Sequence, residues 1–120
     1  MARFVRIDNL TRGTTVAPRC RVASSLRDRG VGLLATPEPP PGDGLLIERT
    51  QSIHMLFMRY SIDVAFIDRE ARVSRCVTAL RPWRMVGWAR GARDCIELGV
   101  GTLAASGTQV GDQLAITDVA

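Results

Sequence analysis

Residues 53–68, with the sequence IHMLFMRYSIDVAFID, are apolar along most of their length and constrain the fold more than any other segment. The segment contains the one histidine of the chain, His54, together with Arg59, Asp63 and Asp68. An apolar run must be buried, and a polar side chain within it costs free energy unless it finds a partner. The segment therefore predicts buried structure that carries either a satisfied polar network or a binding site.

Length and composition indicate one domain spanning residues 1–120, because 120 residues with 46% hydrophobic content can build a single core. No apolar run approaches the roughly 20 residues that cross a bilayer. The start of the chain, MARFVRIDNL, lacks the apolar segment of a signal peptide. We therefore expect a soluble, cytoplasmic protein.

The three cysteines, Cys20, Cys76 and Cys95, are an odd number without CxxC spacing. This pattern argues against a zinc knuckle, a redox dithiol and a complete disulfide framework. Reduced thiols, buried or half-buried, are expected instead. Metal binding at His54 would need more ligands than cluster around it in the sequence, so neither a metal nor a cofactor is predicted.

Short segments rich in Val, Ile and Thr recur between turn residues, a spacing typical of antiparallel β proteins. Strands are predicted over residues 3–8, 14–23, 45–48, 53–58, 62–67, 72–80, 94–98 and 113–117. Short helices are predicted over 25–31 and 102–105. Three consecutive prolines in segment 36–44 exclude a helix or a central strand there, so this segment is expected to be a surface loop. The predicted fold class is mainly β (α+β): one compact domain of short antiparallel strands in a barrel-like or rolled sheet.

An ordered set of segments resembles the bacterial and archaeal "domain of unknown function 192" family. The set comprises RGVGLL at 29–34, segment 53–68, LRPW at 80–83 and CIELGVGTLAASGTQVGDQL at 95–114, and the resemblance covers about residues 22–116. It implies a small β-rich domain with no established reaction. Two positions depart from the family pattern: Ser61 replaces the usual proline, and 97–101 reads ELGVG. Some relatives carry an N-terminal signal or a membrane anchor.

His54 would lie on a strand with apolar residues on both faces, so burial is expected. The simplest interpretation is a core histidine that is hydrogen-bonded through one ring nitrogen. The alternative is a histidine that contacts a ligand or acts as an acid–base group near neutral pH.

Arg59 and Asp63 are four residues apart across a predicted turn. A charge-assisted hydrogen bond between them would brace that corner, and the alternative is that Arg59 receives an anionic ligand. Asp68 begins the polar corner of the predicted 62–80 hairpin. Its side chain is expected to cap backbone N–H groups there.

All sixteen basic residues are arginines, and the formal net charge is +4. Segment 81–93 combines Arg81, Arg84, Arg90 and Arg93 with Trp83 and Trp88 and has no acidic residue. Such a mixture suits a nucleic-acid or anion-binding surface. It equally suits a surface loop whose arginine stems cover the tryptophan rings, and the proline and glycines of the segment favour the loop.

The sequence thus favours a non-enzymatic ligand- or protein-binding accessory module. The predicted ligand-binding residues are His54, Arg59, Asp63, Arg81 and Trp83, and the expected partner is a small anionic ligand or a protein. The alternative is a small enzyme with His54 as acid–base and Arg59 holding an anionic substrate. Weak nucleic-acid binding through 81–93 ranks below both, because arginine is the only basic residue used and few aromatic residues are present to stack on bases.

Overall fold

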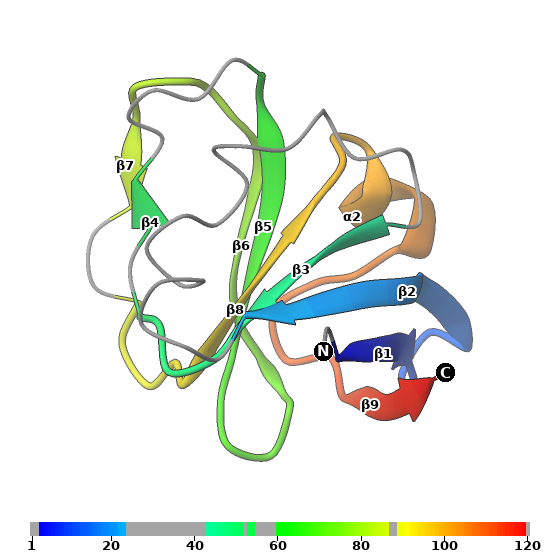
Figure 1. Ribbon diagram of the computed structural model, residues 1–120. Helices are drawn as coiled ribbons and strands as arrows, with labels where there is room; N and C mark the ends of the chain where they lie inside the picture. Colours follow the sequence, from blue (N-terminus) through cyan, green and yellow to red (C-terminus); the bar gives the residue numbers. More distant parts are fainter. Residues whose placement is uncertain (1–2, 24–42, 52, 55–59, 87–88, 120) are drawn as a thin grey trace.

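The computed structural model describes residues 3–23, 43–51, 53–54, 60–86 and 89–119. These residues form nine strands and one short helix (Figure 1). The strands are β1 (Phe4–Asn9), β2 (Thr14–Ala23), β3 (Asp43–Ile47), β4 (Ile53–His54), β5 (Ile62–Ile67), β6 (Val73–Leu80), β7 (Met85–Val86), β8 (Asp94–Leu98) and β9 (Leu114–Val119). The helix is α2 (Thr102–Ser106). The mainly β fold class predicted from the sequence is confirmed.

Seven strands form one sheet in the order β6-β5-β8-β3-β2-β1-β9, and β4 and β7 form a separate two-stranded ribbon. Figure 1 shows this ribbon standing apart from the large sheet, beside β5 and β6. All neighbouring strands of the large sheet are antiparallel except β2 and β3, which are parallel. A parallel pair needs a long crossover connection, which residues 24–42 supply. The predicted helix over 25–31 and the proline loop over 36–44 lie outside the described residues, apart from the last two loop positions, which begin β3.

The two edge strands, β6 and β9, approach each other at one end. An isolated antiparallel bridge joins Arg72 to Gln113. The N–H of Val73 donates to the carbonyl of Asp112 (2.9 Å), and the N–H of Leu114 donates to the carbonyl of Ala71 (3.0 Å). Beyond this bridge the two edges are not paired with each other in the described sheet. The expected closure toward a barrel therefore stops at an open, rolled sheet.

The central strands β5 and β8 are buried on both faces, because the sheet has a core on each side. Successive side chains of a strand point to opposite faces. On β8, Cys95 packs in one core with Phe66 and Leu45, whereas Ile96 packs in the other with Ile67. Complete burial of each large apolar side chain contributes roughly 1.5–3 kcal/mol. The near-continuous apolar sequence of β5 reflects this coverage of both faces.

Two local predictions are confirmed at the turns. The Oδ1 atom of Asp68 accepts the N–H groups of Glu70 and Arg72, both at 2.9 Å, so this residue caps the β5–β6 hairpin. The helix predicted over 102–105 is α2, which ends at Ser106 and is followed by Gly107 in the left-handed conformation. The three cysteines are free in the structure, with Cys20 and Cys95 buried and Cys76 half-buried.

The interpretation of residues 81–93 purely as a loop is wrong for two positions. Met85 and Val86 form β7 and pair with His54 and Ile53 of β4. Val86 is buried in the core that also contains Phe66. The pairing partner lies more than 30 residues away in the sequence, so a local pattern dominated by proline, glycine and arginine did not indicate it.

Candidate functional site

The β4–β7 ribbon brings together the two segments that the sequence analysis assigned to a binding site. His54 pairs with Met85, and Ile53 pairs with Val86. The backbone of His54 therefore lies beside a residue that follows Arg81 by four positions and Trp83 by two. The side chain of His54 and the whole of Arg59 lie outside the described residues. The roles predicted for these two side chains therefore stay predictions.

A tight turn leads from β6 into β7 and presents a large aromatic side chain to solvent. The N–H of Arg84 donates to the carbonyl of Arg81 at 3.2 Å. Trp83, between them, has a φ of 68° and is 59% exposed. A bulky residue with positive φ is an outlier that costs free energy and persists when its surroundings hold it in place. Arg81 and Arg84 are both exposed, so the turn displays two guanidinium groups next to an indole ring.

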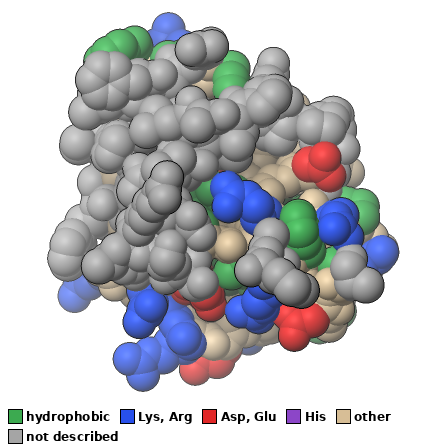
Figure 2. Space-filling view, viewed as in Figure 1, with side chains coloured by type: hydrophobic (Ala, Val, Ile, Leu, Met, Phe, Trp, Pro, Cys, Tyr) green, Lys and Arg blue, Asp and Glu red, His purple; other side chains and the backbone are tan. Residues whose placement is uncertain are grey.

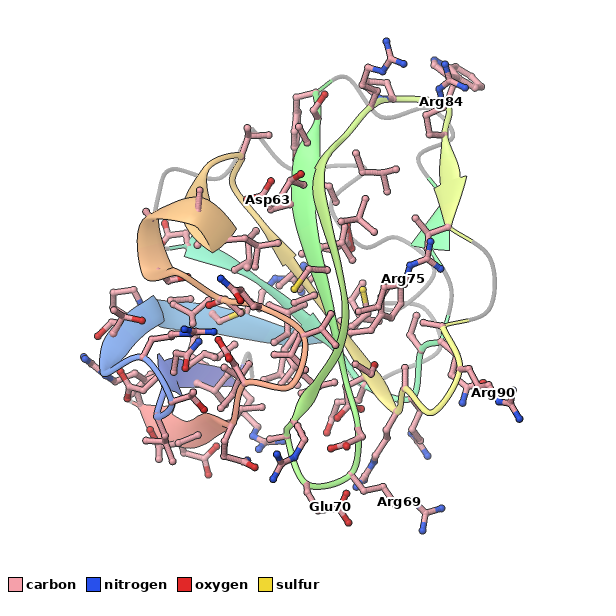
Figure 3. All side chains as sticks on the ribbon, turned by 180° about the vertical axis from the view of Figure 1, so that it is seen from behind. Asp63, Arg69, Glu70, Arg75, Arg84 and Arg90 are labelled. Atoms are coloured by element: carbon pink, nitrogen blue, oxygen red, sulfur yellow. The ribbon has the colours of Figure 1, made fainter. Side chains whose placement is uncertain are left out.

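Asp63 is buried behind this turn, and its carboxylate serves the backbone. One oxygen accepts the N–H of Ala79 at 2.9 Å, and the other accepts those of Gly101 and Leu103 at 3.1 and 3.0 Å. Ala79 has a φ of 49°, so Asp63 holds a strained backbone two residues before Arg81. Figure 3 shows Asp63 between β5 and the start of α2. All its described bonds are structural, and the predicted Arg59–Asp63 pair involves a residue outside the described part.

Glu97 is a second buried carboxyl group, and it was not among the site residues predicted from the sequence. Only 4% of the residue is exposed, and burial raises its pKa from 4.5 to about 7. On β8 it lies between Leu45 of β3 and Val64 of β5, on the same face as Cys95. Among the described residues its side chain has no hydrogen bond or ion pair. A carboxyl group that titrates near neutral pH in an apolar setting is suited to proton transfer.

A sequence signal for Glu97 did exist. Glu97 is the acidic residue within the otherwise apolar residues 95–98 of β8. As in residues 53–68, a polar side chain in an apolar run costs free energy unless it finds a partner. The cysteines, by contrast, are poor nucleophiles. Burial raises the pKa of Cys20 to about 12 and that of Cys76 to about 11, and it raises the pKa of Cys95 well above its usual range. Because the thiolate is the reactive form, little of the reactive form of these thiols is present near neutral pH.

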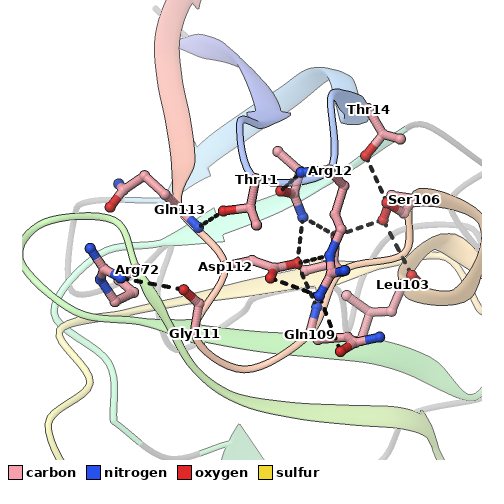
Figure 4. A network of polar contacts seen from close by, with 12 residues as sticks. Thr11, Arg12, Thr14, Arg72, Leu103, Ser106, Gln109, Gly111, Asp112 and Gln113 are labelled. Carbon is pink, nitrogen blue, oxygen red and sulfur yellow. Dashed lines mark hydrogen bonds and ion pairs between the residues drawn. The ribbon is translucent and has the colours of Figure 1, made fainter.

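A third polar cluster, built around Asp112, ties the β1–β2 turn to the segment before β9 (Figure 4). Asp112 accepts two hydrogen bonds from the guanidinium of Arg12, at 3.0 and 3.2 Å, and one from the side-chain amide of Asn9 at 3.0 Å. The N–H of Gln109 adds a further bond at 3.0 Å. The Arg12 bonds are the main cause of the lowered pKa of Asp112, which is about 2. Both carboxylate oxygens of Asp112 accept hydrogen bonds from the protein itself, which indicates a structural cluster.

The described residues contain neither a cluster of metal ligands nor a membrane-spanning helix. No group of three or more His, Cys, Asp or Glu side chains in the described part of the chain is placed to hold a metal ion. Within the same residues, no helix has the length and apolar character needed to cross a membrane.

The fold and sequence both match known proteins. A family model for DUF192, described as "Uncharacterized ACR, COG1430", matches residues 8–116, and the chain belongs to this family. The resemblance drawn from the sequence is thereby confirmed. A UPF0127 protein of Thermococcus sibiricus is 34% identical over 113 residues, which cover 88% of this chain and 71% of that protein. A UPF0127 protein of Pyrococcus furiosus is 32% identical over 109 residues, which cover 88% of this chain and 93% of the relative.

Two solved structures are similar in fold. A putative transcription regulator from Sinorhizobium meliloti superposes with a TM-score of 0.82 at 20% identity, covering 97% of this chain and 94% of that one. A protein of unknown function from Novosphingobium aromaticivorans superposes with a TM-score of 0.76 at 17% identity, covering 93% and 83%. At these identities the likeness establishes the fold alone.

Proposed function

We propose that this chain is a non-enzymatic binding module that takes a small anionic ligand at the end of the molecule formed by the β6–β7 turn and the β4–β7 ribbon. The observation that carries the proposal is Trp83, an exposed indole in a left-handed backbone conformation between two exposed arginines. Strained backbone conformations of this kind cluster at ligand sites. They persist only where the surrounding structure maintains them against their cost in free energy.

The chemistry of the turn fits a planar or forked anion. A guanidinium group donates two parallel hydrogen bonds to a carboxylate or a phosphate. An exposed indole provides a flat apolar surface that can cover the uncharged part of the same ligand. Asp63 supports the site indirectly, because it anchors Ala79 two residues before Arg81. His54 and Arg59 complete the site as predicted from the sequence, the first on the strand paired with β7 and the second five residues later.

Calorimetric titration with inorganic phosphate, a dicarboxylate and a nucleoside monophosphate tests the proposal. We expect saturable binding of at least one of these anions, accompanied by a change in tryptophan fluorescence. The variant Arg81→Gln should weaken that binding about tenfold or more, because a charge-assisted hydrogen bond contributes about 1.5–3 kcal/mol. The matched control is Arg6→Gln, which removes the same charge from β1, where Arg6 pairs with Asp8. Equal effects of the two substitutions would contradict the site.

A second candidate function, a small acid–base enzyme, is favoured by one specific observation: the pKa of Glu97 lies at about 7. In this alternative His54 and Glu97 exchange protons with a substrate and Arg59 holds its anionic group. The variant His54→Gln keeps a hydrogen-bonding side chain but cannot titrate. If a panel of ester, phosphoester and amide substrates revealed turnover that this folded variant abolished, the binding-module proposal would be wrong.

A further inference from the structure

Two sets of arginines in the described part of this chain occupy different parts of the molecule, while Arg72 and Arg93, which lie near the second set, have partners within the protein. Those near β1 are paired: Arg3 with Asp118, Arg6 with Asp8 and Arg12 with Asp112. Five others, around β6 and β7, are exposed, and their side chains have no hydrogen bond or ion pair among the described residues: Arg69, Arg75, Arg81, Arg84 and Arg90. A surface that evolved simply for solubility would mix both signs of charge.

Acidic residues are missing from the sequence around four of these five arginines, whereas Arg69 lies between Asp68 and Glu70. Residues 71–93 contain six arginines and neither aspartate nor glutamate. In Figure 3, Arg84, Arg75 and Arg90 follow one side of the molecule from top to bottom, and Arg69 lies at the lower end beside Glu70. Figure 2 shows several blue side chains at the lower left of the opposite view, with red side chains beside them. We call the five unpaired arginines, together with Trp83, the arginine strip.

The arginine strip is long compared with any small anion. The eight residues of β6 span about 25 Å at about 3.3 Å per residue, and the strip extends beyond both ends of that strand. The longest dimension of the whole chain is 35 Å. A ligand that contacts Arg69 and Arg84 at once must therefore be extended, and negative charges repeated along it would contact the arginines between them.

We propose that the arginine strip binds single-stranded nucleic acid, with the phosphates along the arginines and a base stacked on Trp83. Phosphodiesters match the guanidinium fork. Trp83 favours a single strand, because the base faces of a duplex are already stacked on one another, while an exposed indole offers an unpaired base a stacking partner. An acidic protein segment could neutralise the arginines but has no use for the exposed ring. The inference rests on the anion-binding function proposed above and extends it from one end of the strip to its full length.

Fluorescence anisotropy with labelled single-stranded oligonucleotides of 4 to about 16 nucleotides, the range of small single-strand-binding domains, tests the proposal. We expect affinity to rise with length and to fall with salt. The log–log slope should be about −0.7 for each phosphate neutralised, or about −3.5 if all five arginines engage. Arg75→Gln and Arg69→Gln should each weaken binding severalfold and reduce the slope by about 0.7. The control Arg6→Gln should leave both quantities nearly unchanged.

The Trp83→Ala substitution should weaken strand binding about tenfold, which is within the usual contribution of one stacked base. Poly-glutamate and duplex DNA are the competing ligands. No binding at tens of micromolar in low salt would overturn the proposal, and so would tighter binding of poly-glutamate or of the duplex than of the single strand.

The two proposals fail in different ways. Suppose that a nucleoside monophosphate binds and Arg81→Gln abolishes its binding, but longer strands gain no affinity. The proposal that the arginine strip binds a strand is then wrong, and the proposal of a small-anion site is supported. If long strands bind with the expected salt slope while no small anion binds, strand binding by the arginine strip is supported and the proposal of a small-anion site is wrong.

Discussion

The carboxylate of Asp63, on β5, accepts the N–H of Leu103, in the first turn of α2, at 3.0 Å, and so joins two elements that lie 40 residues apart in the sequence. The same side chain accepts N–H groups from Ala79 and Gly101. Three separated backbone segments therefore depend on one buried residue. In an environment of low dielectric, satisfied networks of this kind are strong, and partly satisfied ones are costly.

Replacing this carboxylate should be strongly destabilising. Asp63→Asn keeps the size of the side chain but leaves it one acceptor oxygen, so at least one buried N–H loses its partner. We expect the free energy of unfolding to fall by about 2–4 kcal/mol, since bonds to charged groups contribute about 1.5–3 kcal/mol and an orphaned donor costs more. Urea unfolding monitored by circular dichroism measures the change. Asp118→Asn, at an exposed ion pair, is the matched control and should cost less than about 1 kcal/mol.

The Arg12–Asp112 pair should make stability depend on acidity. The pKa of Asp112 is lowered from 3.8 to about 2, chiefly by hydrogen bonds from Arg12. A carboxyl group whose pKa is lower in the folded state stabilises the fold at pH values above its pKa in the unfolded state. That contribution disappears as pH falls from about 4 through about 2. Melting temperatures measured from pH 7 to pH 2 should fall within this window for the parent chain. Arg12→Gln should melt lower at pH 7 and show a shallower decline in acid. Parallel curves for the two proteins would contradict the pairing.

Glu97 should give the opposite pH dependence. Its pKa is raised by burial, so the folded state retains a proton that the unfolded state releases above about pH 4.5. Stability should therefore be greatest below that pH and decline until about pH 7, by roughly 3 kcal/mol at 1.36 kcal/mol per pKa unit. Glu97→Gln removes the titrating group, and at pH 8 it should be more stable than the parent chain. Urea unfolding at pH 5 and pH 8 measures both effects. A Glu97→Gln variant with an unchanged pH profile would refute the assignment.

The close approach of β3 to β8 should make Gly44 intolerant of any side chain. A Cβ atom there would lie 2.5 Å from the carbonyl oxygen of Glu97 and 2.9 Å from a methyl carbon of Leu98. Gly44→Ala should cost about 1–3 kcal/mol or more, because overpacking forces the backbone to shift. Thermal unfolding measures the loss. Gly13→Ala is the comparison: nothing lies within 4 Å of its Cβ, but its φ of 69° is positive, so a smaller loss of about 1 kcal/mol is expected. A larger loss at Gly13 than at Gly44 would contradict this explanation.

The sequence by itself determined the local structure of this protein. The bounds of β2, β5 and β8 agree with the ranges predicted from apolar residues and flanking turns, and α2 differs by one residue. The hairpin cap at Asp68 also follows from sequence, since a side chain that bonds N–H groups two and four residues later needs no distant partner. Each of these features depends on interactions between near neighbours in the chain.

Only the tertiary structure decided the functions of the buried carboxyl groups and the grouping of the arginines. Asp63 was predicted to pair with Arg59, which lies outside the described residues, and its described bonds go to backbone groups 16, 38 and 40 residues away. The pKa of Glu97 is raised because the residue is buried on β8, which lies between β3 and β5 in the sheet. The parallel β2–β3 pair and the β4–β7 ribbon depend likewise on which distant strands meet. Pairing between distant segments is set by the packing of the whole core, and a local residue pattern carries little information about it.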